Sequence, residues 1–174
     1  MFKLFALIIL VFSATIVSIY SLSVADINGG SIRFNQYINK KILVVNTATG
    51  NAQANQQLTE LQQLYQQQHD SLVIIAFPSN SFGNEPGTNA EIKNFMQATY
   101  GITFPIAAKS WLTGDSANAI YKWFANKQQN DVMNAKTEKD FQKFLIDRNG
   151  NIIGRFDSSI SPLSSIILNA VQQN

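Results

Sequence analysis

Residues 42–45 read Ile-Leu-Val-Val, and residues 72–77 read Leu-Val-Ile-Ile-Ala-Phe. Unbroken aliphatic runs of this kind are typical of strands that are buried on both faces, as in parallel sheets. Between the two runs, Leu58, Leu61 and Leu64 recur at helical spacing. A strand, a helix and a second buried strand in this order predict a parallel β-α-β unit at the centre of an α/β fold.

The segments on either side of this unit extend the prediction. Asn28-Gly29-Gly30, between β-prone segments within residues 23–34, predicts a hairpin, and Ile19-Tyr20-Ser21-Leu22 predicts a first strand before it. Near the other end, Asn149-Gly150 predicts a tight turn between strands at 144–146 and 151–153. Together with helices expected at 88–101, 117–126 and 163–171, this order predicts a three-layer α/β/α structure with a central mixed sheet and an N-terminal β-hairpin, which is the thioredoxin-like layout.

The helix between the two buried strands carries a run of glutamines. Because the leucine stripe beside it is intact, we interpret the run as a solvated helix face rather than a prion-like segment. His69 follows at the end of this helix and is expected to be exposed to solvent. The glutamines concerned are Gln62, Gln63, Gln66, Gln67 and Gln68.

Composition excludes several classes of function. The chain has 174 residues, of which 14% are charged, and a formal net charge of +2 without long basic runs. This argues against nucleic acid as a partner, since a phosphate-binding surface needs clustered Lys and Arg. There is no cysteine and a single histidine. Disulfides, Cys-ligated zinc and thiol nucleophiles are therefore excluded, and we expect no metal site and no cofactor.

The N-terminus has the features of an export segment. Lys3 is followed by an uncharged, mostly apolar run from Leu4 to Ala25. We expect residues 1–18 to form a signal peptide or a retained N-terminal anchor, and residues 19–174 to form one domain. A buried helix is the remaining alternative. Either of the first two would place the domain outside the cytoplasm, in the periplasm or secreted, and in contact with a membrane only if the segment is retained.

Four ordered stretches resemble the glutathione peroxidase family, over about residues 19–170. The resemblance implies a thioredoxin-like fold and the reduction of hydrogen peroxide or organic hydroperoxides with thiol donors, in the response to oxidative stress. Family members use a cysteine or selenocysteine in the loop after the first buried strand, together with a Gln, a Trp and an Asn. The stretches are residues 24–29, 42–49, 77–87 and 141–156, including Phe77-Pro78-Ser79-Asn80-Ser81-Phe82-Gly83 and Phe141-Gln142-Lys143-Phe144-Leu145-Ile146-Asp147.

Matching the family motifs to this chain places a different residue type at each of the four catalytic positions. Asn51 stands at the nucleophile position, Ser81 at that of the glutamine, and Lys139 and Asp140 at those of the Trp and the Asn. A family cysteine is also replaced by Ser79, another by Met96, and the loop after Gly83 is one residue shorter. We therefore expect a catalytically silent protein that retains the fold.

Three function classes follow from this interpretation. The first is an exported pseudoenzyme that binds a protein or a small polar ligand through the former active-site face. The second is a residual thiol-dependent peroxidase that works by an unrecognised route, and the third is a structural role at the membrane. If the fold holds, Asn51, Ser81, Lys139 and Asp140 could form a small polar pocket; alternatively, Lys139-Asp140 is a solvated loop pair of little energetic value.

Overall fold

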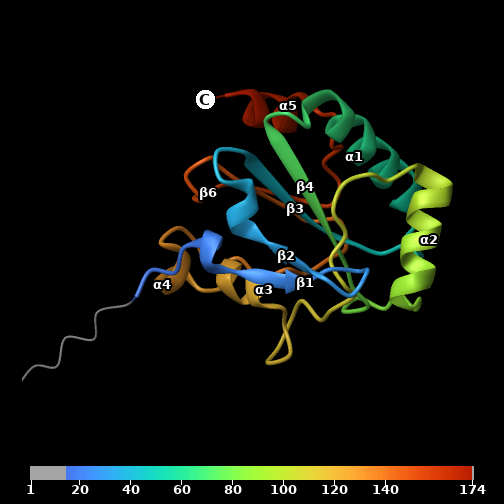
Figure 1. Cartoon of the computed structure of the whole chain (residues 1–174), viewed down its shortest axis with the longest axis horizontal. Coiled ribbons are helices and arrows are strands. Elements are labelled where there is room, and N and C mark those ends of the chain that lie inside the picture. Colours follow the sequence, from blue (N-terminus) through green and yellow to red (C-terminus); the bar gives the residue numbers. More distant parts are fainter. Residues whose placement is uncertain (1–14, 174) are drawn as a thin grey trace, which may run out of the picture.

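The central sheet has the strand order β4-β3-β5-β6 in residues 15–173, the part of the chain that the computed structural model describes (Figure 1). β3 pairs with β4 in parallel and with β5 antiparallel, and β5 pairs antiparallel with β6. The sheet is therefore mixed, and the predicted parallel unit and C-terminal hairpin are confirmed. The strands are β3 (Lys41–Thr47), β4 (Leu72–Pro78), β5 (Lys143–Ile146) and β6 (Ile152–Phe156).

Helices cover both faces of this sheet. Alternate residues of β3 and β4 point to opposite sides, so that Ile42 and Ile75 belong to one apolar cluster and Leu43 and Ile74 to the other. The first cluster is closed by the N-terminal hairpin and by α3 (Ala119–Phe124), which α4 (Lys127–Asn130) follows. The second is closed by α1 (Ala54–Gln68), α2 (Asn89–Tyr100) and α5 (Ser165–Gln172). The predicted three layers are confirmed.

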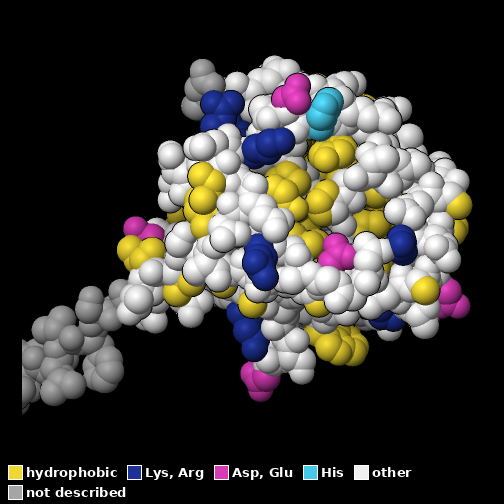
Figure 2. Space-filling view, viewed as in Figure 1, with side chains coloured by type: hydrophobic (Ala, Val, Ile, Leu, Met, Phe, Trp, Pro, Cys, Tyr) yellow, Lys and Arg dark blue, Asp and Glu magenta, His cyan; other side chains and the backbone are white. Residues whose placement is uncertain are grey.

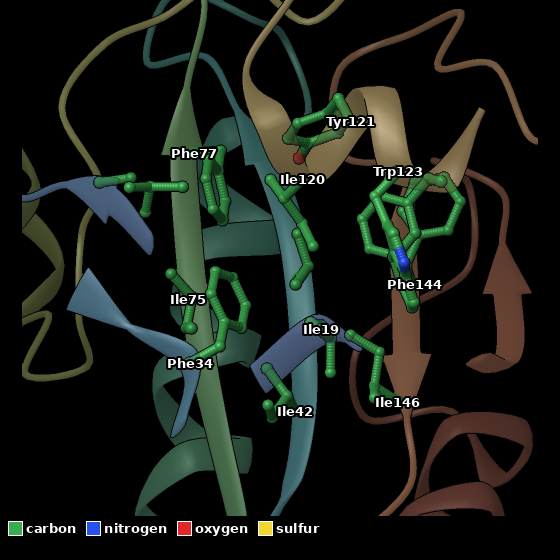
Figure 3. Packing of buried hydrophobic residues seen from close by; sticks show 14 of the residues in the cluster. Ile19, Phe34, Ile42, Ile75, Phe77, Ile120, Tyr121, Trp123, Phe144 and Ile146 are labelled. Carbon is green, nitrogen blue, oxygen red and sulfur yellow. The ribbon is translucent and has the colours of Figure 1, made fainter. Parts of the chain in front are cut away.

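Aromatic side chains fill the cluster beneath α3. Figure 3 shows Tyr121 and Trp123 of α3 meeting Phe77 and Phe144 of the sheet. Tyr121 makes edge contacts with Phe77 and Phe144, with ring centroids 5.4 and 6.4 Å apart, and Phe144 stacks on Phe124 at 4.0 Å. Such aromatic pairs contribute free energy beyond that of the apolar area they bury. They therefore stabilise the packing of α3 against the sheet.

The N-terminal hairpin joins the main sheet through an extended segment at residues 105–110. β1 (Ser23–Ala25) and β2 (Ser31–Arg33) pair antiparallel, as predicted. The amide of Ala107 donates to the carbonyl of Ala76 in β4, while the amide of Ala108 donates to the carbonyl of Ala25. Residues 105–110 therefore continue the sheet beyond β4.

The prediction of a first strand at residues 19–22 is wrong. Ile19–Ser21 form a short 3-10 helix, η1, in which the Ser18 hydroxyl accepts a hydrogen bond from the Tyr20 amide. A second such helix, η2, spans Phe34–Tyr37. Ile19 is fully buried because its side chain packs into the apolar core, although its backbone does not belong to a sheet. A single buried residue inside a short apolar run has no strand periodicity, and the run alone does not distinguish the two.

The interpretation of the glutamine run is correct for most of it but wrong for Gln62. Gln63, Gln66 and Gln67 are exposed. Gln62 is buried, and its amide group donates to the Thr103 hydroxyl at 2.9 Å and accepts from the Thr103 amide at 3.0 Å. The burial is tolerated because both ends of the side-chain amide have partners. His69 is exposed at the end of the helix, as expected.

Most of the predicted N-terminal segment, residues 1–14, lies outside the described residues. Residues 17 and 18, which we assigned to that segment, contact the domain: the amide of Val17 donates to the carbonyl of Gln129, and the Trp123 indole donates to the carbonyl of Val17 at 2.7 Å. Among residues 15–173, no helix is long and apolar enough to cross a bilayer. The division at residue 18 stays a prediction.

Thr88 caps α2 in a capping box, and its removal should measurably weaken the fold. The Thr88 hydroxyl accepts from the Glu91 amide, and the Glu91 carboxylate accepts from the Thr88 amide at 2.8 Å. We expect Thr88→Ala to lower the free energy of unfolding by about 1 kcal/mol, as measured by urea denaturation. Thr88→Ser keeps a hydroxyl and should stay close to the wild type; equal losses in both variants would contradict this account.

Candidate functional site

Asn51 lies in the loop between β3 and α1, at the carboxyl end of the central strand. This end of an α/β sheet is where ligands and catalytic groups collect, because the strands deliver their following loops to one edge. The Asn51 Oδ1 accepts from the Gln53 amide at 2.8 Å, so the side chain is oriented by its own loop. Its Nδ2 then donates to Oδ2 of Asp140 at 3.0 Å. The structure therefore brings two of the four predicted site residues into direct contact.

Asp140 is a buried carboxylate that two side-chain amides hold. It is 3% exposed, and Oδ2 accepts from Nδ2 of Asn51 and from Nδ2 of Asn84, the latter at 2.7 Å. Oδ1 is also buried and has no hydrogen-bond partner among the described residues. No Lys, Arg or His side chain of residues 15–173 lies within ion-pair distance of it. This edge of the sheet thus holds a buried carboxylate group without a cationic partner among the described residues.

Asn84 is a site residue that sequence reasoning did not identify. It lies in the loop after Gly83, and its backbone carbonyl also accepts a hydrogen bond from the Gly50 amide at 3.0 Å. The loop that contains Asn84 is therefore tied to the loop that contains Asn51. The sequence signal was a polar residue, Asn84, in a loop that is one residue shorter than the family pattern.

Lys139 lies on the surface and points away from its neighbour Asp140. Its ammonium group is 3.5 Å from the Asp157 carboxylate, and its side chain is 59% exposed. The pKa of Asp157 is lowered to about 2, first by a hydrogen bond from the Ser159 amide, then by the hydroxyls of Ser158 and Ser159, and least by Lys139. An exposed pair of this kind contributes little to stability. The sequence left two expectations for Lys139-Asp140, a polar pocket or a solvated loop pair. Lys139 is solvated, whereas Asp140 is buried.

Ser81 belongs to a separate hydrogen-bond group. Its hydroxyl oxygen accepts from the Ser79 hydroxyl and from the Leu112 amide, both at 2.9 Å. Within the described residues, no hydrogen bond links Ser81 to Asn51 or Asp140. The four predicted residues therefore form an Asn51–Asp140 pair, a Ser81 turn and an exposed Lys139, instead of one polar pocket.

The pair has no group that can attack a peroxide. The Asn51 nitrogen is a carboxamide nitrogen whose lone pair is delocalised, and it donates its hydrogen to Asp140. Glu85, which follows Asn84 in the chain, is a second fully buried carboxylate group, and it accepts from the Thr49 amide and hydroxyl. Two buried carboxylates at one edge would disfavour any anionic nucleophile there. Among residues 15–173, no group of three or more His, Asp or Glu could hold a metal ion.

Comparison with known proteins identifies the family. A family model described as glutathione peroxidase matches residues 19–125, which is more than half of the chain. The chain belongs to the glutathione peroxidase family. The match includes the loops of Asn51 and Ser81 and ends before Lys139 and Asp140. The resemblance to the family that the sequence analysis described is therefore confirmed.

Relatives of known name agree with this assignment. A probable glutathione peroxidase 8 of Arabidopsis thaliana is 38% identical over 149 residues, which cover 84% of this chain and 89% of the relative. Glutathione peroxidase-like peroxiredoxin 2 of Saccharomyces cerevisiae is 36% identical, with 84% and 91% covered. The crystal structure of Trgpx in apo form superimposes with a TM-score of 0.67 at 30% identity, and covers 90% of this chain and 97% of that one.

The fold extends to more distant proteins. A thioredoxin family thiol:disulfide interchange protein of Chlorobium tepidum superimposes with a TM-score of 0.64 at 16% identity, over 91% of this chain and 98% of that one. At this identity the likeness shows the fold alone. The predicted thioredoxin-like fold class is confirmed.

Proposed function

We propose that this member of the glutathione peroxidase family is a catalytically silent, exported protein that acts by binding a small polar ligand or a protein. The single observation that carries the proposal is the hydrogen bond from the Asn51 amide to the buried Asp140 carboxylate. It occupies the place where the family pattern has a cysteine or selenocysteine beside an asparagine. A hydrogen-bonded amide stands in that place, in a chain that contains no cysteine.

The chemistry of the reaction supports this proposal. Cleavage of a peroxide O–O bond needs a soft anionic nucleophile, held near donors that stabilise the leaving oxygen. Methionine sulfur can be oxidised, but its sulfoxide is returned only by a dedicated reductase. Because catalytic groups that act as a set contribute non-additively, loss of the nucleophile alone removes most of the rate, and the other replacements then cost little more. The same argument explains why all four positions could change.

The exported part of the proposal rests on the N-terminal sequence. A single lysine followed by an uncharged apolar run is typical of a secretory signal. Cell fractionation combined with the mass of the mature N-terminus tests it: export predicts a protein outside the cytoplasm, and loss of about the first 13 to 18 residues distinguishes cleavage from a retained anchor. A full-length protein in the cytoplasm would contradict export.

A peroxidase assay tests catalytic silence. Purified protein is mixed with hydrogen peroxide or cumene hydroperoxide, in the presence of glutathione or of a thioredoxin-regenerating system. We expect the rate of peroxide loss to equal that of Asn51→Ala and Ser81→Ala variants, because neither residue takes part in turnover. Turnover well above the protein-free rate that either substitution abolishes would overturn the proposal and favour a residual thiol-dependent peroxidase.

A further inference from the structure

A pocket of about 320 Å³ lies between α3 and the segment that leads into β5, and none of the four family positions lines it. It is adjacent to two of them: the amide of Leu112, in its wall, donates to Ser81, and Thr137, in the opposite wall, precedes Lys139 by two residues. Its size is at the lower end of the range for small-molecule sites. The residues that matter to the argument are Leu112, Tyr121, Lys122, Ala125, Lys136 and Thr137.

Two hydroxyl groups in the pocket lining are buried without a partner. Thr137 is 5% exposed and Tyr121 is 2% exposed, and neither Oγ1 of Thr137 nor the Tyr121 hydroxyl has a hydrogen-bond partner among the described residues. Buried hydroxyls are almost always paired, since an unpaired one loses its hydration without compensation. Burial also raises the pKa of Tyr121 well above its usual value, so that this hydroxyl remains a donor. The lining is therefore short of hydrogen-bonding partners.

Two lysines give the pocket a positive charge. The Lys136 ammonium has no hydrogen-bond or ion-pair partner among residues 15–173, and that of Lys122 donates to the carbonyl of Asp115 at 2.6 Å. The acidic residue in the lining, Glu138, lies 3.8 Å from the Arg155 guanidinium, which also donates to the carbonyl of Lys136. Arg155 thus lies beside the Glu138 carboxylate and the backbone of Lys136. Figure 2 shows that, on the face it draws, Lys and Arg side chains are scattered among uncharged polar ones.

We propose that this pocket binds a small organic carboxylate, with the carboxylate near Lys122 and Lys136, the apolar body against Leu112 and Ala125, and polar substituents near the unpaired hydroxyls. The inference rests on the binding role in the proposed function and specifies its ligand class. Apolar walls with a few convergent polar groups and a net positive charge match a ligand of mixed character. The interaction of the carboxylate with Lys136 should contribute most to the binding free energy, because no protein group already pairs with that ammonium.

Fluorine NMR with 4-fluorobenzoate, and with 4-fluorobenzamide as its uncharged counterpart, tests this inference on the full chain. We expect saturable binding of the benzoate, amide shift changes at Leu112, Ala125 and Thr137, and affinity for the benzamide about tenfold lower, the factor that one charged hydrogen bond contributes. Lys136→Met should weaken benzoate binding about tenfold. Lys93→Met removes a positive charge from α2, outside this pocket, and should leave the affinity unchanged.

Thr137→Val provides a second variant that keeps the shape of the pocket. Since it removes an unpaired buried hydroxyl, it should fold at least as stably as the wild type, and it should weaken the binding of 3-fluoro-4-hydroxybenzoate, which carries a polar substituent, more than that of 4-fluorobenzoate. Equal affinity for 4-fluorobenzoate and 4-fluorobenzamide, equal effects of Lys136→Met and Lys93→Met, or no saturation at tens of millimolar probe would overturn the ligand inference. The binding experiment and the peroxidase assay measure different properties, so failure of the ligand inference can be distinguished from failure of the proposed loss of catalysis.

Discussion

A cysteine placed at position 51 should react with hydrogen peroxide no faster than an ordinary thiol, and a second substitution, Asp140→Asn, should speed that reaction about tenfold. In the present structure the side chain at position 51 contacts the buried Asp140 carboxylate, which has no cation beside it among the described residues. A buried carboxylate next to a thiol raises the thiol pKa by roughly 1–3 units. The thiolate, which is the reactive form, is depleted accordingly.

The size of the expected gain follows from two opposing effects. Removal of a shift of about 2 units raises the thiolate fraction about a hundredfold, but each thiolate becomes less nucleophilic as its pKa falls, with a Brønsted coefficient of about 0.4–0.5. The net acceleration is therefore about tenfold. Adding Ser81→Gln and Lys139→Trp would restore the remaining family residue types and should raise the rate further, although Ser81 now faces Leu112 and Ser79.

The measurement compares second-order rates of thiol loss and the thiol pKa in Asn51→Cys with and without Asp140→Asn. Asp157→Asn is the matched control, because Asp157 is an exposed carboxylate in the same region of the fold, paired with Lys139. It should leave the rate of the Asn51→Cys protein nearly unchanged, since exposed charges are screened by water and salt. Equal rates in the Asp140 and Asp157 combinations would show that the buried carboxylate does not control this position.

Stability should rise by about 2 kcal/mol between pH 8 and pH 10 because of Lys143. Lys143 is fully buried in β5, and its ammonium donates to the carbonyls of Phe141 and Ile160, each at 2.9 Å. Burial lowers its pKa to about 8, against the opposing effects of Asp157 and Glu60. From pH 8 to its usual pKa of about 10.5, the unfolded chain binds more protons at this residue than the folded one. The folded state is therefore favoured increasingly as the pH rises.

The upper limit of this window is set by Tyr121. Its pKa is raised by burial, so above about pH 10 the unfolded chain loses the tyrosine proton first and stability falls. Urea denaturation at pH 8, 9 and 10 checks the rise, and Lys143→Met should remove most of it. Lys41, whose pKa burial also lowers, should add a smaller rise in the same direction. A Lys143→Met protein with the same dependence on pH as the wild type would contradict this assignment.

Much of the fold could be predicted because it depends on patterns within single segments. The aliphatic runs of β3 and β4 and the leucine stripe of α1 each identify an element, and their order implies the crossover. The prediction for Ile19 was wrong because a short apolar run is equally compatible with a strand and with a 3-10 helix that buries one residue in the core. Gln62 was misplaced for a related reason: its burial depends on Thr103, which lies on a distant segment.

The candidate site divides in the same way. The absence of cysteine and the replacement of four family residues are properties of the sequence, and they alone imply the loss of thiol chemistry. Which replacements meet depends on loop geometry. The loop after Gly83 places Asn84 beside Asp140, Lys139 lies at the surface near Asp157, and Ser81 bonds to Leu112. None of these partners is near in sequence, so no local pattern predicts them.

For this protein, the amino-acid sequence by itself determined the layer order, the family and the absence of cysteine, because hydrophobic periodicity and residue identity are local quantities. Only the tertiary structure decided that Asp140 is buried between Asn51 and Asn84, that Lys143 is enclosed, and that unpaired hydroxyls line a pocket beside α3. Burial and pairing set the charge state and the availability of each polar group, and both arise from contacts between segments that folding brings together.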